Sequence, residues 1–416
     1  MRAGWPGLSR DARLLVAGQG VRAAGYGFTA VLLGALLAAR GYTPVQVGVV
    51  LTALIAGTAL ASLAVGGYAD RLGRRRCYGV FFAGNAVAGV VVASGAPLWV
   101  LLLVALTGTL STDIVDNGPA TTLEQAMLAA EDAGTATVYG WYNMVGAAAG
   151  ALGALAVALP GLGRNAPAAG SHGWLFAVLV PVGLAGVLIA GRLSPAVEAS
   201  LPGAARARLA ESRRVVRRLA GLFAVDAAGG GLVTTGFLSY YFAERYHASA
   251  AQLGWLFFAV SVVQAVSVTL APLLARRFGL VATMVGTHLP SNLLLAAVAF
   301  APAFPVAALL LLARTTLSQM DVPTRQALVM SVVEPEERTA AAAVTNAARY
   351  TVRPIGPLVA GAVQQFALGA PLVVAGAVKA GYDLALWGWA RHLPLRSRDQ
   401  HRPGDAPARS AAGEQS

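Results

Sequence analysis

Charged residues and cysteines are scarce in this 416-residue chain. Only 12% of its residues are Asp, Glu, Lys or Arg, whereas soluble domains contain about 25%. The single cysteine, Cys77, excludes an internal disulfide framework and a cysteine-based metal site. Apolar residues make up 56% of the chain, and 48 residues are glycine, which lets membrane helices approach closely. This composition indicates a polytopic membrane protein.

The sequence also lacks the motifs of soluble enzymes. It contains no phosphate-binding glycine loop followed by Lys and Ser or Thr, which disfavours an ATP-driven pump, and no His-Glu-x-x-His string. We therefore expect no enzyme activity, no cofactor and no bound metal. The apolar run that begins at Leu14 is too long for a cleavable signal peptide and predicts a first membrane span.

Continuous apolar runs predict an all-α protein with twelve membrane-spanning helices. A bilayer core of about 30 Å requires about 20 apolar residues per helix. The runs do not alternate with the period of two that membrane strands show. The predicted spans cover residues 14–39, 45–69, 77–95, 98–118, 136–159, 173–191, 219–242, 251–274, 280–300, 305–322, 340–366 and 370–390.

The positions of the cations predict the orientation of these spans. If the amino terminus is inside, the cytoplasmic segments hold 23 of the 31 cations and the outer loops hold three, Arg40, Arg164 and Arg245. This distribution follows the positive-inside rule, so we expect a multi-pass protein with both termini inside. We also expect a monomer in a bacterial cytoplasmic membrane. The net charge of +12 then indicates contact with membrane lipids rather than with nucleic acid.

A long basic connection divides the spans six and six. We expect an amino-terminal six-helix bundle over residues 1–191, a basic cytoplasmic linker over 192–218 and a second six-helix bundle over 219–392. Residues 393–416 are polar and rich in Pro, Ser and Gly, which predicts a disordered cytoplasmic tail.

The two sets of six spans carry an internal repeat. Gln46-Val-Gly48 matches Gln252-Leu-Gly254, Arg22 matches Asp226, and Asn143 matches Asn346, with an offset of 203 to 206 residues throughout. An even number of spans in each copy gives the copies the same topology. Parallel repeats of this kind occur in secondary transporters, whose substrate site lies at the interface of the repeats.

The loop between spans two and three resembles the signature loop of the major facilitator superfamily. The matching residues are Gly66, Asp70, Arg71, Gly73, Arg74 and Arg75. The resemblance covers residues 10–392 and implies that superfamily's fold of two pseudo-symmetric bundles. It also implies that Asp70 pairs with a nearby Arg as a conformational latch between the halves, while Gly66 allows close packing and Gly73 a tight turn. A plain positive-inside turn is the alternative.

Ionisable residues inside spans are costly and are therefore candidates for function. The resemblance places Arg22, with Tyr26 one turn later, opposite Asp226 across the central cavity. The pair is either part of the solute pathway or a salt bridge that permits burial. The other pathway candidates are Asp116, Asn117, Asn143, Asp321, Arg325 and Asn346. Asp116 and Asp321 are proton carriers, gate partners or interfacial caps. Asp226 is the favoured proton carrier, because the resemblance puts Arg22 opposite it in the other half.

Span twelve contains the only lysine, Lys379, and Asp383 follows one turn later. Because this spacing puts both side chains on one helix face, they form either a buried structural pair or a coupling pair. Arg349 and Arg353 in span eleven and His288 in span nine complete the set of buried polar residues, and we expect His288 to be a satisfied core residue.

The resemblance therefore implies a secondary active transporter that moves a small polar or amphiphilic solute by alternating access. Buried Arg and Asp favour an anionic or zwitterionic solute, and buried carboxylates favour proton coupling. Gly146, Gly150 and Gly153 in span five form a degraded version of the superfamily's antiporter signature, without its proline, which tilts the expectation towards efflux. The alternatives are uptake, a lipid or lysolipid flippase, and a non-transporting sensor.

Overall fold

Helices make twelve crossings, and no strand occurs in the part of the chain that the structure describes. A computed structural model describes residues 8–114, 118–129, 135–159, 169–198, 209, 211–334 and 337–391. Seven of its helical stretches are long and apolar enough to cross a membrane without interruption or with one short break. The other five crossings are two single helices, Thr135–Ala156 and Ala370–Ala390, and three crossings that are each divided into two helices.

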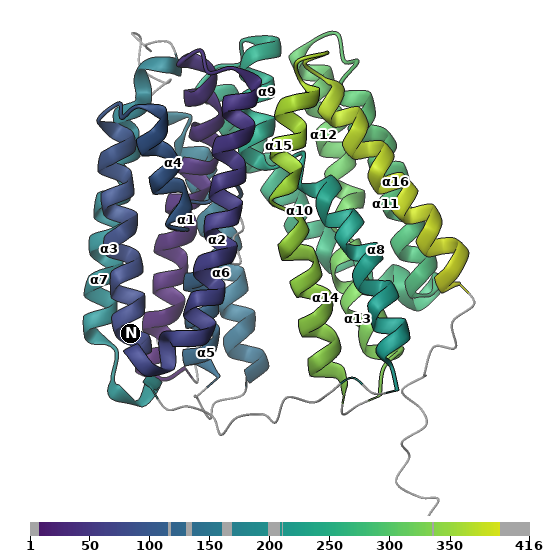
Figure 1. Ribbon diagram of the computed structural model, residues 1–416, viewed down its shortest axis with the longest axis horizontal. Coiled ribbons are helices and arrows are strands. Elements are labelled where there is room, and N and C mark those ends of the chain that lie inside the picture. The colour runs from purple at the N-terminus through teal and green to yellow at the C-terminus, as the bar shows by residue number, and fades with distance from the viewer. Residues whose placement is uncertain are drawn as a thin grey trace, which may run out of the picture.

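The first six crossings form one bundle, on the left of Figure 1. Their helices are α1 (Arg10–Ala39), α2 (Pro44–Leu72), α3 (Arg74–Ala93), α4 (Leu98–Leu106) with α5 (Pro119–Leu128), α6 (Thr135–Ala156), and the 3₁₀ helix η2 (Ala169–Val178) with α7 (Leu179–Arg192). A short 3₁₀ helix, η3 (Pro195–Glu198), follows α7.

The last six crossings form the second bundle (Figure 1). They consist of α8 (Arg213–Gly231) with α9 (Thr235–Tyr246), α10 (Ala250–Phe278), α11 (Leu280–Val298), α12 (Phe304–Ser318) with α13 (Asp321–Ser331), α14 (Arg338–Val352) with α15 (Ile355–Val363), and α16 (Ala370–Ala390). The first turns of α8 thus occupy residues 213–218, which the sequence assigned to the linker. Residues 393–416 lie outside the described residues.

Matching helices of the two bundles begin and end with the same local chemistry. Thr43 and Ser249 cap α2 and α10, each in a reciprocal capping box with a glutamine three residues later. Gly73 and Gly279 end the same two helices at φ values of 91° and 86°, a region that favours glycine. The repeat predicted from the sequence is therefore visible in the backbone.

The fourth and tenth crossings extend further than the sequence predicted. Predicted ends at residues 118 and 322 are wrong, because α5 continues to Leu128 and α13 to Ser331. Pro119 begins α5, where its missing N–H would have no partner in any case. Several polar residues of these segments are buried against neighbouring helices, namely Thr121 and Glu124 of α5 and Asp321, Thr324 and Arg325 of α13.

Helix packing repeats in the two bundles. In the first bundle α1 packs on α6, α2 on α4, and α3 on α7; in the second α8 packs on α14, α10 on α12, and α11 on α16. Contacts between the bundles follow the same symmetry, because α2 packs on α15 and α6 on α10, while α1 packs on α9.

Three hydrophobic clusters show where the bundles join. We call the side on which α1 begins and α16 ends the terminal face, and the other side the opposite face; the terminal face is at the bottom of Figure 1. Near the opposite face, one apolar core contains buried residues of both bundles. Near the terminal face, each bundle has a core of its own. The bundles are therefore joined towards the opposite face and separate towards the terminal face.

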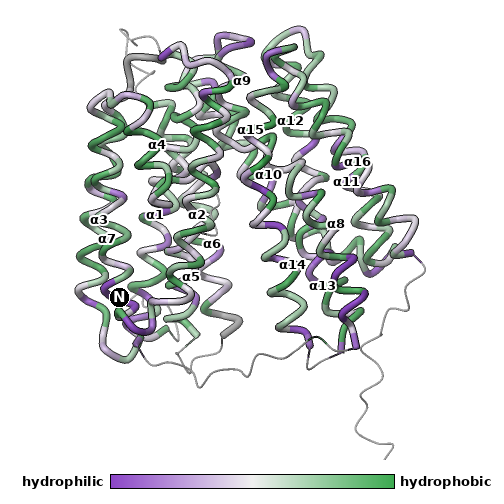
Figure 2. Tube along the Cα trace, viewed as in Figure 1, coloured by the Kyte–Doolittle hydropathy of each residue, from purple (hydrophilic) through white to green (hydrophobic). Residues whose placement is uncertain are grey.

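Apolar residues predominate along the helices, as Figure 2 shows, while hydrophilic residues gather at helix ends and around α8, α13 and α14. Large hydrophobic side chains such as Leu63, Trp99 and Phe366 are more than half exposed. Such a surface suits a hydrocarbon environment and would be a liability in water.

Glycines allow the bundles to approach closely near the opposite face. A side chain on Gly34 of α1 would collide with the backbone of Gly236 and Tyr240 in α9, and one on Gly48 of α2 with Pro357 and Gly361 in α15. The joint between the bundles is thus built from backbone contact as well as from apolar side chains.

We expect Gly34→Leu to lower the melting temperature of the purified protein, because overpacking a close contact costs about 1–3 kcal/mol. Gly221→Leu is the matched control, since a side chain at that exposed α8 position meets nothing within 4 Å. Equal melting temperatures for the two variants in a thermal unfolding scan would contradict the close α1–α9 contact.

Candidate functional site

The first bundle buries one ion pair at the centre of a hydrogen-bonded cluster. Arg22 of α1 lies 2.9 Å from Glu124 of α5, and the two residues are 2% and 0% exposed. The Arg22 guanidinium also donates to Thr121 at 2.8 Å. Tyr78 and Tyr142 donate to the two oxygens of Glu124 at 2.7 and 2.6 Å. Both charges are thus neutralised within the bundle.

Tyr26, predicted to lie on the solute pathway, contacts this cluster one helical turn after Arg22. Its ring lies 5.6 Å from the Arg22 guanidinium carbon, a cation–π contact. Its hydroxyl donates to the carbonyl oxygen of Thr109 at 3.0 Å. Tyr26 is 1% exposed, so it serves packing and hydrogen bonding in this conformation.

The second bundle buries a larger network around Asp226 of α8. Lys379 of α16 forms an ion pair with one Asp226 oxygen, and Arg325 of α13 lies 3.5 Å from the other. His288 of α11 places Nε2 3.8 Å from Asp226. Arg325 also pairs with Asp321, one turn earlier on α13, at 2.5 Å. Four helices therefore meet at these charges.

Lys379 and Asp383 share a helix face but do not form the predicted pair. Lys379 reaches Asp226, while Asp383 accepts hydrogen bonds from Asn292 at 2.8 Å and contacts His288 Nδ1 at 2.8 Å. The reason is that α16 packs against both α8 and α11, so each residue finds a partner on a different neighbour. His288 bridges Asp383 and Asp226 and lies in the cavity wall described below.

The predicted pairing of Arg22 with Asp226 is wrong as well. Both residues are described, and each has its ion-pair partner in its own bundle. Arg22 pairs with Glu124 between the first and fourth crossings, and Asp226 contacts Arg325 between the seventh and tenth. The two bundles thus use the same helix pair with the charges exchanged. Opposite charges at repeat-related positions reflect this exchange rather than contact across the molecular axis.

An unwound segment between α4 and α5 connects the two bundles. Asp113 in this segment forms an ion pair with Arg353, at the break between α14 and α15. The same carboxylate accepts a hydrogen bond from the backbone N–H of Thr235, at the amino end of α9, at 3.0 Å. Gly236 N–H donates to the Thr112 carbonyl oxygen at 2.9 Å. Asp113 thus joins the bundles through a helix amino terminus and an arginine.

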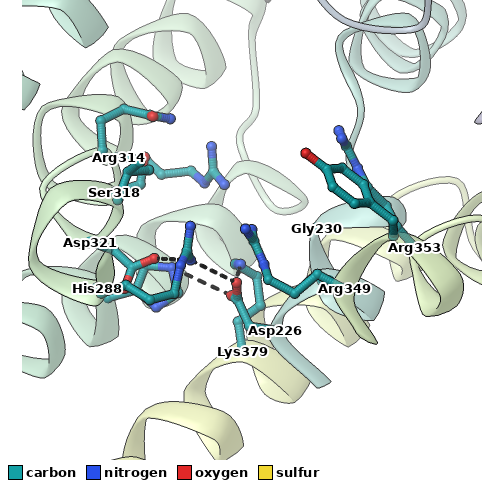
Figure 3. A pocket seen from close by; sticks show the side chains of 14 residues that line it. Asp226, Gly230, His288, Arg314, Ser318, Asp321, Arg349, Arg353 and Lys379 are labelled. Carbon is teal, nitrogen blue, oxygen red and sulfur yellow. Dashed lines mark hydrogen bonds and ion pairs between the residues drawn. The ribbon is translucent and has the colours of Figure 1, made fainter. Parts of the chain in front are cut away.

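A polar cavity of about 270 Å³ lies in the second bundle beside this network. Figure 3 shows Arg314 of α12 and Arg349 of α14 extending into it from opposite sides. The charged and titratable lining residues are Asp226, His288, Arg314, Asp321, Arg325, Arg349, Tyr350, Arg353 and Lys379. The cavity therefore holds three of the predicted pathway residues, Asp226, Asp321 and Arg325.

The remaining pathway candidates are not part of this cavity. Asp116 and Asn117 lie outside the described residues. Asn143 of α6 and Asn346 of α14 are exposed, and neither belongs to the cavity lining. Asn143 and Asn346 lie on helices that pack equivalently in the two repeats, α6 on α1 and α14 on α8.

The signature loop ends α2 and begins α3, and Asp70, Arg74 and Arg75 bind partners in their own bundle in this conformation. Asp70 pairs with Arg74 at 2.7 Å, and Arg74 also donates to the Ala126 carbonyl oxygen of α5 at 3.1 Å. The amino end of α3 is capped by Glu198, which accepts from the N–H groups of Arg74 and Arg75. The Asp70 side chain is 60% exposed.

Two glycines and Arg71 complete this loop. Gly73 makes the predicted turn at a φ of 91°. The close packing predicted at Gly66 is wrong for this conformation, because a side chain there would meet nothing within 4 Å; the bundles are apart at this end. Arg71 is exposed. The latch role of Asp70 stays a prediction for a conformation in which the terminal face is closed.

Sequence patterns did not identify Glu124 as the partner of Arg22 or Asp113 as the partner of Arg353. Glu124 lies beyond the predicted end of the fourth span, and Asp113 is one of several carboxylates in that region. Proline 119 and the surrounding polar residues indicated a broken helix, and a broken membrane helix requires partners for its freed backbone groups. That requirement could have directed attention to Asp113.

The repeated packing, the paired broken crossings and the signature loop agree with the family found by sequence comparison. The chain matches the Major Facilitator Superfamily over residues 15–357. It belongs to that superfamily. The protein is therefore a multi-pass membrane protein and a secondary transporter of a small solute, with the two-bundle fold that the sequence predicted. Members of the superfamily are transporters rather than enzymes.

One curated protein and two solved structures illustrate what this superfamily member is similar to. An uncharacterized membrane protein of Saccharomyces cerevisiae is 26% identical over 392 residues, covering 85% of this chain and 88% of the yeast protein. The crystal structure of the nucleoside transporter NupG has a TM-score of 0.73 at 15% identity and covers 91% of this chain and 97% of that one. A D-xylose–proton symporter has a TM-score of 0.69 at 14% identity, covering 92% and 98%. These structures share the fold.

A double-mutant cycle should couple Arg22 to Glu124 and not to Asp226. Arg22→Gln leaves the Glu124 charge buried without its cation, so we expect a loss of about 3–5 kcal/mol in the free energy of unfolding. Adding Glu124→Gln should recover most of it. Arg22→Gln and Asp226→Asn should be additive within about 0.5 kcal/mol; strong coupling between these two would contradict the separate ion pairs.

Asp113→Asn should weaken closure of the opposite face, because it removes the charge that Arg353 and the α9 amino terminus share. Spin labels at Gln125 of α5 and Gln326 of α13, both exposed, would report the separation of the bundles at the terminal face. We expect the variant to gain a population with a shorter distance between labels. Glu244→Gln, a carboxylate elsewhere on α9, serves as control, and identical distance distributions for both variants would refute the closing role of Asp113.

Proposed function

We propose that this transporter carries a small polar solute through the cavity beside Asp226 and couples its movement to protons. The observation that carries the proposal is the charged cavity in the second bundle. Near the terminal face the two bundles have separate cores, so the cavity can be reached between them. The shared apolar core and the Asp113–Arg353 pair close the path towards the opposite face. This arrangement supports a conformation that admits solute from the terminal face.

The distribution of cations supports a cytoplasmic terminal face. Cytoplasmic segments, defined by the predicted topology, hold 23 cations against three in the outer loops. We therefore infer that both termini are cytoplasmic and that the described conformation faces inward. We also retain the bacterial cytoplasmic membrane as the proposed location and a monomer as the proposed transporting unit.

Two buried carboxylates of the cavity differ in how fully they are neutralised. Asp226 has Lys379, Arg325 and His288 around it. Asp321 has only Arg325 as ion-pair partner among the described residues, and its Oδ1 atom is buried without a hydrogen-bond partner. An unpartnered buried oxygen gains more from receiving a proton than one that is already bound. We infer that Asp321, rather than Asp226, carries the proton.

For the direction of transport we propose antiport, in which proton entry drives export. The support is the glycine pattern of α6. In the structure Gly153 lets α6 approach α1 closely, since a side chain there would collide with the backbone of Ala24. A polar cavity with this many charges favours a polar solute over the acyl chains that a lipid flippase would admit.

Asp321→Asn should abolish solute movement driven by an imposed pH gradient while preserving exchange between equal solute pools. Exchange needs binding and alternation but no net proton transfer. The assay uses proteoliposomes with an internal pH dye and a panel of sugars, nucleosides, amino acids and organic acids. Asp383→Asn is the control, since its carboxylate already has two partners. Gradient-driven movement in the Asp321→Asn variant would exclude this residue as the proton carrier.

A further inference from the structure

The wall of the cavity carries more positive than negative charge. Its cations are Arg314, Arg325, Arg349, Arg353 and Lys379, and its carboxylates are Asp226 and Asp321. Counting His288 as neutral, the wall has three positive charges in excess. A site of this sign attracts anions and repels cations.

Three of the five cations have acidic partners. Lys379 pairs with Asp226, Arg325 with both Asp226 and Asp321, and Arg353 with Asp113.

Arg314 and Arg349 are the exceptions, because neither has an ion pair within the ranges that the structure describes. The Nε atom of each is buried and has no hydrogen-bond partner there.

Arg314 and Arg349 are each half-buried. Because an arginine remains charged under all physiological conditions, neither guanidinium can reduce its desolvation penalty by losing a proton. Burial of an unpaired charge is strongly unfavourable. Arg314 comes from α12 and Arg349 from α14, and they enter the cavity from opposite sides (Figure 3). Two planar guanidinium groups in this arrangement suit a carboxylate or phosphate group, which accepts paired N–H bonds from arginine.

We propose that Arg314 and Arg349 bind the oxyanion group of the transported solute, which is a small organic anion bearing a carboxylate or a phosphate. This rests on the proposed function and specifies its substrate class. The cavity volume of about 270 Å³ lies just below the range of sites for drug-sized ligands, so the solute is small. A neutral sugar would leave both guanidinium groups without a counter-charge, and a cation would be repelled.

Binding is tested with the full-length protein in detergent by thermal unfolding in the presence of four probes, succinate, glucose 6-phosphate, glucose and choline. At least one of the two anions should raise the melting temperature in a saturable manner, while glucose and choline should not. Succinate and glucose 6-phosphate distinguish a carboxylate from a phosphate site. Arg314→Gln and Arg349→Gln should each weaken the apparent affinity by roughly tenfold or more, as expected for loss of a charged hydrogen bond.

Arg276→Gln is the matched control, because Arg276 is an exposed arginine at the end of α10. It should leave anion binding unchanged. A second measurement needs no ligand at all: without anion, Arg314→Gln and Arg349→Gln should melt at or above the wild-type temperature, since each removes an uncompensated charge.

The proposal is overturned if neither anion stabilises the wild type, if the arginine variants respond like Arg276→Gln, or if both variants melt well below the wild type without ligand. Its failure is distinct from failure of the proposed function. Glucose that exchanges across proteoliposomes without anion binding would refute the anion site and keep the transporter. An anion that binds through Arg314 and Arg349 but never exchanges would keep the site and refute the proposed path.

Discussion

The membrane interior requires that a buried charge be neutralised by a close partner, and the construction of both bundles depends on this requirement. In the first bundle the pair is Arg22 and Glu124, and in the second it is Asp226 with Lys379 and Arg325. Each pair joins helices that are distant in sequence. The ion pairs therefore fix how the first and fourth crossings, and the seventh and tenth, are rotated relative to each other.

The exchange of charges between the bundles also separates their roles. Glu124 is fully engaged by Arg22 and two tyrosine hydroxyls, so the cluster of the first bundle is closed on itself. The second bundle has more cations than it can pair, and that excess faces a cavity. Arg353 belongs to the cavity wall and also pairs with Asp113 of the other bundle. Arg353 thus links a solute in the cavity to the ion pair that holds the bundles together.

Most of the fold followed from sequence patterns, because long apolar runs and a repeat offset of 203 to 206 residues are local or periodic signals. The partners of buried charges did not. Spacing put Lys379 and Asp383 on one face of α16. Both α8 and α11 pack against α16, and only this packing decides which of the two residues meets Asp226. Glu124 was overlooked as the partner of Arg22 because hydropathy ended the fourth span before α5. Broken helices carry polar residues deeper into the membrane than a hydropathy profile indicates.

The joint near the opposite face has a mechanical consequence. Where Gly34 meets Gly236 and Gly48 meets Gly361, the backbone of one bundle touches the backbone of the other, beside the side chains of the shared apolar core. Interdigitated side chains would have to change rotamer before one surface could move along the other. Glycine surfaces can roll over each other with little such resistance. The glycine contacts between the bundles thus form a pivot. The bundles can tilt about this pivot while their separate cores stay intact.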